Sequence, residues 1–191
     1  MKVLVAYALR KEMVNINWPG VEVIPIVTGE GKACAALELM RALLKERPDH
    51  VINIGTAGTF HLSVGDIVVP RHFIDRDLLT THLPGVEYDF QPDETNFAGF
   101  PSIINGCVCN RSFTISTGDN FITSGSKDQA DVVDMESFAM LQACRRENVP
   151  FCAIKYVTDV IGSNSVTHWQ NQLQDARQAL ERYFQNYCIK R

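Results

Sequence analysis

The sequence lacks the long hydrophobic run of a membrane span. An early apolar run, residues 3–9, is cut off by Arg10, Lys11 and Glu12, whereas a helix that crosses a bilayer needs about 20 apolar residues. This run also has no plausible signal-peptide cleavage site behind it. We therefore expect a cytoplasmic protein that has no membrane partner.

An excess of basic charge is missing as well. The net charge is -4 and the isoelectric point is about 5.7, so no basic patch is implied and nucleic acid is not an expected partner. Repeats and low-complexity tracts are also absent. At 191 residues, with 46% hydrophobic and 21% charged residues, the chain can bury one sizeable core and is short for two. We expect a single domain over residues 1–191.

Cysteine is too sparse for a disulfide scaffold, because six cysteines are spread over the whole chain. Cys34 and Cys144 fall in helical patterns and Cys152 in a strand pattern, so buried free thiols are predicted. Cys107 and Cys109 form the one close pair, and no Cys or His lies near them at zinc-ligand spacing. We expect no metal site.

The glycine-rich nucleotide-binding motifs are incomplete. Gly29 and Gly31 lie between an apolar run and a helical pattern, as in a dinucleotide-binding turn. However, the third glycine position holds Cys34, and no acidic residue ends the next strand, residues 51–54. The lysine that follows is misplaced for a phosphate-binding loop. We expect neither a nucleotide cofactor nor any other cofactor.

Strand and helix patterns alternate along the chain, which is typical of an α/β fold. Residues 71–100 are the exception, since they show no sustained period and are longer than an ordinary connection. We expect this segment to be a functional or subunit-contacting excursion. Strands are predicted at residues 2–7, 21–27, 51–54, 67–69, 107–117, 132–136 and 151–157, and helices at 32–46, 137–147 and 166–187.

Two glycine turns mark a possible binding edge of this sheet. The first, Gly55-Thr56-Ala57-Gly58, is predicted as a turn at the carboxyl end of the strand at residues 51–54, where open α/β sheets bind ligands. Glycine there lets the backbone approach a ligand closely and adopt positive φ. Taken alone, this turn is better explained as a plain connection that needs small residues for steric reasons. The second turn, at Gly118, leads to Phe121 and Ile122, which are either core residues or a platform for a flat ligand.

Three carboxylates, Glu12, Glu136 and Asp159, lie at or just after the ends of predicted strands. Each alone is explained as a solvated or structural side chain. Together they indicate a site for a polar, flat, uncharged ligand. One carboxylate can accept both hydroxyls of a ribose, a second can protonate a heteroaromatic leaving group, and a third can take a proton from water.

Seven blocks of sequence, in order and from end to end, resemble the purine nucleoside phosphorylase/nucleosidase superfamily, and most of all its 5'-methylthioadenosine/S-adenosylhomocysteine nucleosidase branch. The resemblance implies a single-domain, three-layer α/β/α fold with a central mixed, mostly parallel sheet. It also implies a homodimer that hydrolyses the N-glycosidic bond of a purine nucleoside and releases adenine, as in methionine salvage. The blocks are residues 8–12, 29–36, 53–58, 64–69, 116–122, 133–136 and 157–159.

The resemblance assigns the chemistry to two of the carboxylates. Glu12 matches the acid that activates the attacking water, and Thr56 and Ala57 match the turn near the sugar and the water. Asp159 matches the aspartate that donates a proton to purine N7, and Thr158 holds the hydroxyl position before it. This division of work is that of an inverting glycosidase, and it requires Asp159 to keep a proton near neutral pH.

The resemblance assigns substrate binding to four further residues. Glu136 matches the glutamate that binds the ribose 2'- and 3'-hydroxyls, and Met135 packs on the sugar. Phe121 matches the ring stacked on the base, and Ile122 matches the residue whose backbone reads the edge of the base.

Two other functions remain open from the sequence. Phosphorylases of the superfamily carry an arginine where this chain has Asn53, and Glu12 would repel a phosphate bound by Arg10, so hydrolysis is favoured. A fold relative that only binds or stores nucleosides would not need an acid and a base together. The chain is shorter than usual for the family around the base and the 5'-substituent, so the preferred substrate is not assigned. Residues 71–100 are the candidate contact with a second subunit.

Overall fold

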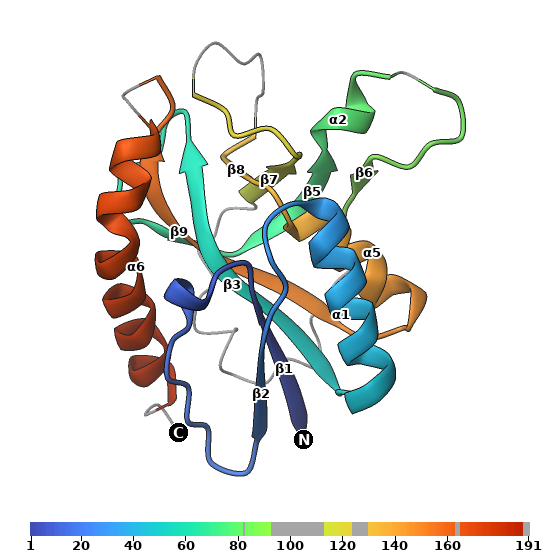
Figure 1. Cartoon of the computed structure of the whole chain (residues 1–191), viewed down its shortest axis with the longest axis vertical. Helices are drawn as coiled ribbons and strands as arrows, with labels where there is room; N and C mark the ends of the chain where they lie inside the picture. The colour runs from blue at the N-terminus through green and yellow to red at the C-terminus, as the bar shows by residue number, and fades with distance from the viewer. Residues whose placement is uncertain (82, 93–112, 124–129, 163–164, 189–191) are drawn as a thin grey trace.

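The chain folds around one mixed sheet with helices on both faces (Figure 1). The computed structural model describes residues 1–81, 83–92, 113–123, 130–162 and 165–188, of which 165–168 and 186–188 are described by their backbone only. Helix α6 covers one face of the sheet, and α1 and α5 cover the other. The strands are β1 (Lys2–Tyr7), β2 (Glu22–Val27), β3 (His50–Thr59), β4 (Ile67–Val68), β5 (Pro70–Asp75), β6 (Asp89–Phe90), β7 (Phe113–Thr117), β8 (Val132–Asp134) and β9 (Phe151–Val160). The helices are η1 (Arg10–Glu12), α1 (Lys32–Glu46), α2 (Arg76–Leu79), α5 (Ser137–Arg146) and α6 (Ser165–Cys188).

The predicted three-layer fold is confirmed. The strand order is β2-β1-β3-β8-β7-β5-β6, with β9 paired to the other side of β3 and β4 paired to β9. Five of the eight strand pairings among the described residues are parallel, so the sheet is mixed and mostly parallel as expected.

Strand β3 lies in the middle and divides its side chains between two cores. Val51 and Ala57 face the core under α1 and α5, whereas Ile52 and Ile54 face the core under α6. Successive strand residues point to opposite faces, so a strand covered on both faces is apolar throughout. This explains the continuous apolar run in the sequence.

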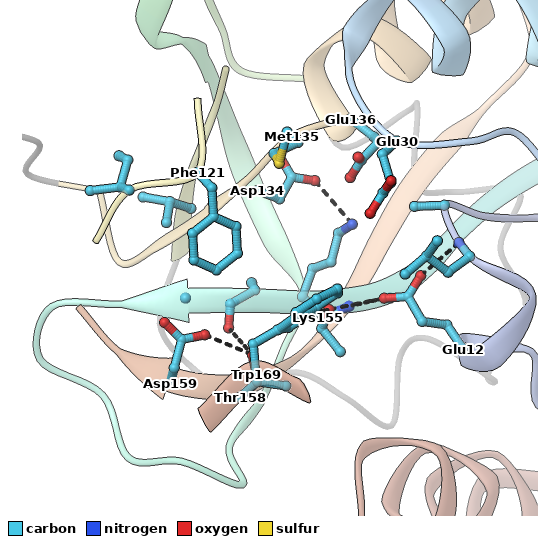
Figure 2. A pocket seen from close by; sticks show the side chains of 18 of the residues that line it. Glu12, Glu30, Phe121, Asp134, Met135, Glu136, Lys155, Thr158, Asp159 and Trp169 are labelled. Atoms are coloured by element: carbon cyan, nitrogen blue, oxygen red, sulfur yellow. Dashed lines mark hydrogen bonds and ion pairs between the residues drawn. The ribbon is translucent and has the colours of Figure 1, made fainter. Parts of the chain in front are cut away.

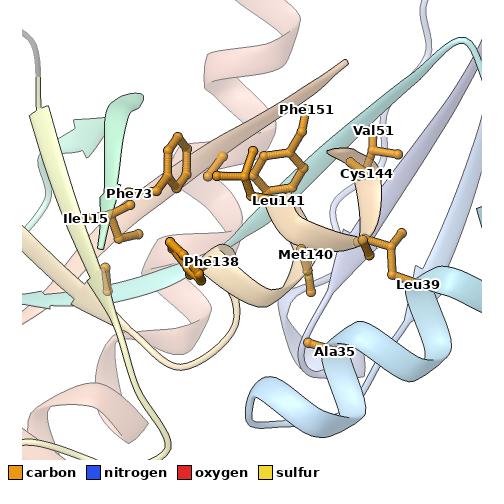
Figure 3. Close-up of a cluster of buried hydrophobic side chains, with 14 of the residues drawn as sticks. Ala35, Leu39, Val51, Phe73, Ile115, Phe138, Met140, Leu141, Cys144 and Phe151 are labelled. Carbon is orange, nitrogen blue, oxygen red and sulfur yellow. The ribbon is translucent and has the colours of Figure 1, made fainter. Parts of the chain in front are cut away.

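The helices bury the stripes that their periodicity predicts, with one exception. In α1, Leu39 and Leu43 belong to the core under α1 and α5, and Figure 3 shows Leu39 facing the side chains of α5. Leu44, an apolar residue of the same helix, is 60% exposed. It follows Leu43 directly, and neighbouring residues of a helix lie about 100° apart, so both cannot point inward. Cys34 on the same helix is also exposed, which corrects the expectation of a buried thiol, while Cys144 and Cys152 are buried as predicted.

The Gly55–Gly58 segment is not a turn, which corrects the sequence prediction. It continues β3, which pairs with β9 along its whole length up to Thr59 and Val160. Neither glycine has a positive φ. Both are needed for space: a Cβ on Gly55 would lie 3.2 Å from Glu12 Oε1, and one on Gly58 would lie 3.2 Å from Asp159 Oδ2. Because the two glycines have no side chains, they leave room for the carboxylates of Glu12 and Asp159.

The segment at residues 71–100 is more regular than predicted. It contains most of β5, the short helix α2 and the two-residue strand β6. Residues 93–100 lie outside the described part, as does most of the strand predicted over residues 107–117, of which β7 is described. Strand β5 was missed because polar residues interrupt its apolar pattern. The subunit contact expected here stays a prediction.

The sheet opens beside β3, and this opening positions the site. One edge of β3 pairs with β1 as far as Asn53 and with β8 from Gly58 onward. Between these points the edge has no strand partner among the described residues, and its backbone groups are free to bond elsewhere. The opening lies where β1 and β8 diverge, the kind of topological break at which α/β sheets bind ligands.

Candidate active site

A cavity of about 280 Å³ occupies this opening. Its wall includes all nine residues that the sequence analysis singled out, and three carboxylates that are far apart in the chain face the same space (Figure 2). In Figure 2, Glu12 and Asp159 lie at opposite ends of the site. The nine residues are Glu12, Thr56, Ala57, Phe121, Ile122, Met135, Glu136, Thr158 and Asp159.

Glu12 is a buried carboxylate held by three donors. It is the last residue of η1, the short helix that follows β1 in the sequence. The Leu9 N–H donates to Oε2 at 3.0 Å, and the Thr56 N–H and hydroxyl donate to Oε1 at 3.0 and 2.9 Å. Burial raises the pKa of Glu12 above its usual value, although Lys155 and the three donors oppose the shift. The result is a carboxylate with a fixed direction and increased basicity.

A buried ion pair forms part of the cavity wall. Lys155 lies in the middle of β9, and its Nζ is 3.0 Å from Asp134 Oδ2 (Figure 2). Asp134 also accepts bonds from the hydroxyls of Thr117 at 2.6 Å and Ser137 at 2.5 Å. Burial alone would raise the pKa of Asp134, but Lys155 and these donors outweigh it and leave the pKa lowered. A buried charge with several partners is a fixed structural element.

Lys155 interacts electrostatically with more than one carboxylate. Burial alone would lower its pKa, but the charges of Asp134, Glu136 and Glu12 outweigh burial and leave the pKa raised. Lys155 is therefore an ammonium ion with three acidic neighbours. Because Asp134 already neutralises it, Glu12 and Glu136 share its positive charge only in part.

Glu136 joins β8 to α5, and its Oε1 accepts the Gly31 N–H at 2.9 Å. Gly31 precedes α1 with φ +85°, a conformation that favours glycine. Burial and the nearby Asp134 raise the pKa of Glu136 to about 7, while Lys155 and the Gly31 N–H oppose the shift. This side chain therefore titrates near neutral pH.

Asp159 reaches the cavity through an irregularity in β9. Ala57 pairs with Val157 and Gly58 with Asp159, so Thr158 is an extra residue in the ladder. Strict alternation would turn Thr158 and Asp159 to opposite faces, whereas the shift in register lets both line the cavity. Both are buried, and the Thr158 hydroxyl lies 2.9 Å from Asp159 Oδ1.

Phe121 lies on the cavity wall and is supported by Trp169, a residue absent from the predicted site. Phe121 is 42% exposed, and its ring meets Trp169 of α6 edge to face, with ring centroids 6.1 Å apart. The Trp169 indole N–H also donates to the Thr56 hydroxyl at 3.1 Å. An exposed aromatic ring at the mouth of a cavity offers a surface for a flat ligand.

Arg76, at the start of α2, holds the loop that carries Phe121. Its two terminal nitrogens donate to the carbonyl oxygens of Ser116, Asp134, Gly118 and Asn120 at 2.8, 2.9, 2.9 and 2.5 Å. The planar guanidinium suits this multiple contact. It ties the loop before Phe121 to the end of β8, which leads to Met135 and Glu136.

Lys155, Arg76 and Trp169 are among the lining residues that were absent from the predicted site. One carried a usable signal: Lys155 interrupts an otherwise apolar strand, and a lysine is rarely buried without an acidic partner. Arg76 lies in the segment for which no structure was predicted. Trp169 lies near the start of the last helix, where periodicity does not show that it meets β3. Asp75 and Asp77, two acidic residues of the irregular segment, lie off the cavity wall and pair with Lys32 at 2.9 and 2.7 Å.

Neither a metal centre nor a membrane segment is seen in the part of the chain that the structure describes. Its histidine, cysteine and carboxylate side chains form no group of three able to hold a metal ion. None of its helices combines the length and apolar character needed to cross a bilayer.

Comparison with known proteins gives consistent matches. The model of the phosphorylase superfamily matches residues 8–187. The chain is 31% identical over 185 residues to the 5'-methylthioadenosine/S-adenosylhomocysteine nucleosidase of Bacillus velezensis, covering 86% of this chain and 80% of the relative.

Solved structures share the fold at lower identity. The nucleosidase of the same name from Helicobacter pylori, solved with butyl-thio-DADMe-Immucillin-A, superposes with a TM-score of 0.81 at 17% identity and covers 97% of both chains. The futalosine hydrolase of Helicobacter pylori gives a TM-score of 0.80 at 18% identity, over 98% of this chain and 97% of the other. At such identities the likeness establishes the fold alone.

Proposed function

Because this chain belongs to the phosphorylase superfamily, and within it to the 5'-methylthioadenosine/S-adenosylhomocysteine nucleosidases, we propose that it hydrolyses the N-glycosidic bond of a 5'-substituted adenosine. The products are adenine and the 5-substituted ribose. The substrate we expect is 5'-methylthioadenosine or S-adenosylhomocysteine.

The observation that carries this proposal is the surplus of acid in the cavity. Five carboxyl groups and two cationic groups line it among the described residues, and each cation is already engaged by the protein. Breaking an N-glycosidic bond builds positive charge on the ribose. A preformed anionic site stabilises this charge as it develops, because the carboxylates need no reorganisation. The five carboxyl groups belong to Glu12, Glu30, Asp134, Glu136 and Asp159, and the two cations to Arg76 and Lys155.

The same charges argue against phosphate as the nucleophile. The terminal nitrogens of Arg76 are occupied by four carbonyl oxygens, and Lys155 is paired with Asp134. Arg10 is exposed and is not part of the cavity wall. A phosphate dianion would therefore meet buried carboxylates with no unengaged cation on the cavity wall, at a cost of several kcal/mol. Water carries no such penalty.

In the proposed reaction, Glu12 takes a proton from water while the water oxygen bonds to the ribose C1'. The bond between C1' and N9 of adenine breaks, and Asp159 delivers a proton to N7 so that the base leaves neutral. Glu136 accepts the two ribose hydroxyls, with Met135 against the sugar. General acid and general base assistance of this kind are each worth about 10²- to 10⁴-fold in rate.

Phe121 and Ile122 hold the base in this proposal, and Thr56, Ala57 and Thr158 complete the surroundings of the sugar and the acid. We also propose that the enzyme works in the cytoplasm, in methionine salvage, as a homodimer. Equilibrium ultracentrifugation tests the last point, and a strictly monomeric active enzyme would contradict it.

The deciding experiment is a chromatographic assay for free base with purified protein. We expect adenine from 5'-methylthioadenosine in phosphate-free buffer, and an unchanged rate and sugar product when phosphate is added. Glu12→Gln, prepared in parallel, controls for a contaminating nucleosidase. A strict requirement for phosphate, with ribose 1-phosphate as the sugar product, would identify a phosphorylase. Measurable nucleoside binding without any base release would identify a protein that only binds.

A further inference from the structure

The hydrogen bonds around Glu12 continue outward to α6. The Trp169 Nε1 lies 3.1 Å from the Thr56 hydroxyl oxygen, which lies 2.9 Å from Glu12 Oε1. The Thr56 N–H reaches the same Glu12 oxygen at 3.0 Å. Three residues from α6, β3 and η1 thus form one chain that ends on the carboxylate.

This chain has a fixed direction. An indole N–H can only donate, so the Thr56 hydroxyl must use a lone pair to accept it. The hydroxyl then has a single proton left, and an ionised Glu12 can only accept. Trp169 therefore turns the Thr56 proton toward Glu12, and bonds in such a chain strengthen one another by about 10–30% each.

We propose that Trp169 is a positioning residue that acts through the Thr56 hydroxyl to hold Glu12 in its ionised, proton-accepting form. This inference rests on the proposed function, in which Glu12 is the general base. It goes further by tying the last helix of the chain to the activation of water. Without the indole, the hydroxyl can rotate away from Glu12, and the carboxylate loses a donor that favours its charged form.

A competing role for Trp169 is packing alone, because its ring also meets Phe121 edge to face. Trp169→Phe helps to separate the two roles, since it keeps an aromatic ring beside Phe121 and removes the N–H donor together with part of the ring. Thr56→Val removes the hydroxyl at nearly constant volume. The double variant then shows whether the indole acts through that hydroxyl, because coupled residues give non-additive effects.

We expect Trp169→Phe to lower kcat about 3- to 10-fold and to move the acid limb of the pH–rate profile upward by a few tenths of a pH unit, with KM nearly unchanged. In the Thr56→Val background the same change should lower kcat less than twofold further. An equal fall in kcat in both backgrounds would assign Trp169 to packing and overturn the proposal. A rise in KM without a shift of the pH profile would do the same.

Trp18→Phe is the matched control. Trp18 is buried in the core under α6, where it contacts Phe184 and lies away from the cavity wall. Its replacement should leave the pH profile in place, and an equal shift in this variant would show that any loss of a tryptophan has the same effect.

A second readout does not depend on turnover. The Trp18→Phe protein keeps Trp169 as its single tryptophan, because the sequence contains two. We expect its fluorescence to titrate with pH, with an inflection that Glu12→Gln removes and Glu136→Gln retains. An inflection that Glu12→Gln leaves unchanged would show that Trp169 does not respond to the titration of Glu12, and would overturn the proposal. If the wild-type protein cleaves no nucleoside, the proposed function fails, while this titration still reports on the link between Trp169 and Glu12.

Discussion

The two ends of the cavity are built in different ways. At one end, Glu12 is buried and takes three hydrogen bonds from backbone and side-chain donors of η1 and β3. At the other end, Phe121 is 42% exposed and depends on an edge contact with Trp169 and on a loop held by Arg76. The proposed water site is thus preorganised, whereas the proposed base site is a wall open on one side.

The contrast follows from the positions of the two ends in the sheet. Glu12 lies beside the central strand β3, whose open edge supplies a backbone N–H that no neighbouring strand uses. Phe121 follows β7, in the other half of the sheet, and lies in a connection rather than in a strand. A site for one small nucleophile gains from fixed geometry, whereas a site for a large substrate must admit it.

The largest effect should come from breaking the rigid end. Glu12→Gln keeps the size of the side chain and one acceptor oxygen but cannot take a proton from water. We expect kcat to fall about 10²- to 10⁴-fold. Binding of an uncleavable nucleoside analogue, measured by calorimetry, should change less than about fivefold. An active Glu12→Gln enzyme would move the general base elsewhere in the cavity.

A second test concerns the acid surplus shared by the two ends. The pKa of Glu136 is raised to about 7 in the folded protein, so its contribution to stability is fully present below about pH 4.5 and is lost as the pH rises through 7. A pKa of about 7 against an ordinary 4.5 corresponds to at most about 3 kcal/mol. Glu136→Gln should therefore gain stability over the wild type at pH 8 and much less at pH 5.

Urea unfolding of both proteins at pH 5 and pH 8 measures this difference. Glu30→Gln is the matched control, because Glu30 lines the same cavity but is exposed, and its replacement should not change the pH dependence. The more stable Glu136→Gln variant should also bind nucleosides more weakly, as expected where a site is kept at a cost in stability. Parallel stability curves for wild type and Glu136→Gln would rule out the burial of an ionised Glu136.

How far the sequence predicts this molecule depends on the type of signal. The hydrophobic pattern predicted β1 and α1 with the observed bounds, because β1 is a continuous apolar run buried on both faces and α1 has a regular helical period. It missed the extension of β3 through Gly55 and Gly58, since glycines usually interrupt strands and here fit against buried carboxylates. A local pattern cannot reveal a neighbour that comes from elsewhere in the chain.

The candidate site divides in the same way. The residues that match family motifs, such as Glu12 and Asp159, were found and lie on one cavity, while their roles stay predictions. Lys155, Arg76 and Trp169 were missed because their function is to contact other parts of the site. Each acts through a partner distant in sequence: Asp134, the carbonyl oxygens around Gly118, or Thr56.

Removing the support of the open end should have an intermediate effect. Arg76→Ala releases four carbonyl oxygens and frees the loop before Phe121. We expect kcat/KM to fall about 10- to 100-fold, mainly through KM, and free guanidinium to restore part of the loss. Gly118→Ala should produce a similar defect from the other side, because its Cβ would lie 2.7 Å from Arg76 Nε. Unchanged kinetics in both variants would show that the loop is held without this arginine.

The smallest effect should come from Phe121 itself. Phe121→Leu keeps an apolar wall but removes the flat ring, and aromatic contacts add about 0.5–1.5 kcal/mol beyond the burial of area. KM should rise about 3- to 10-fold, while kcat changes less than twofold because Glu12 and its donors are untouched. Val64→Ala, an exposed apolar residue off the cavity wall, serves as the control in the same assay. If Phe121→Leu lowered kcat as strongly as Glu12→Gln does, the two ends would be coupled, and the contrast between a rigid water site and an open base site would be wrong.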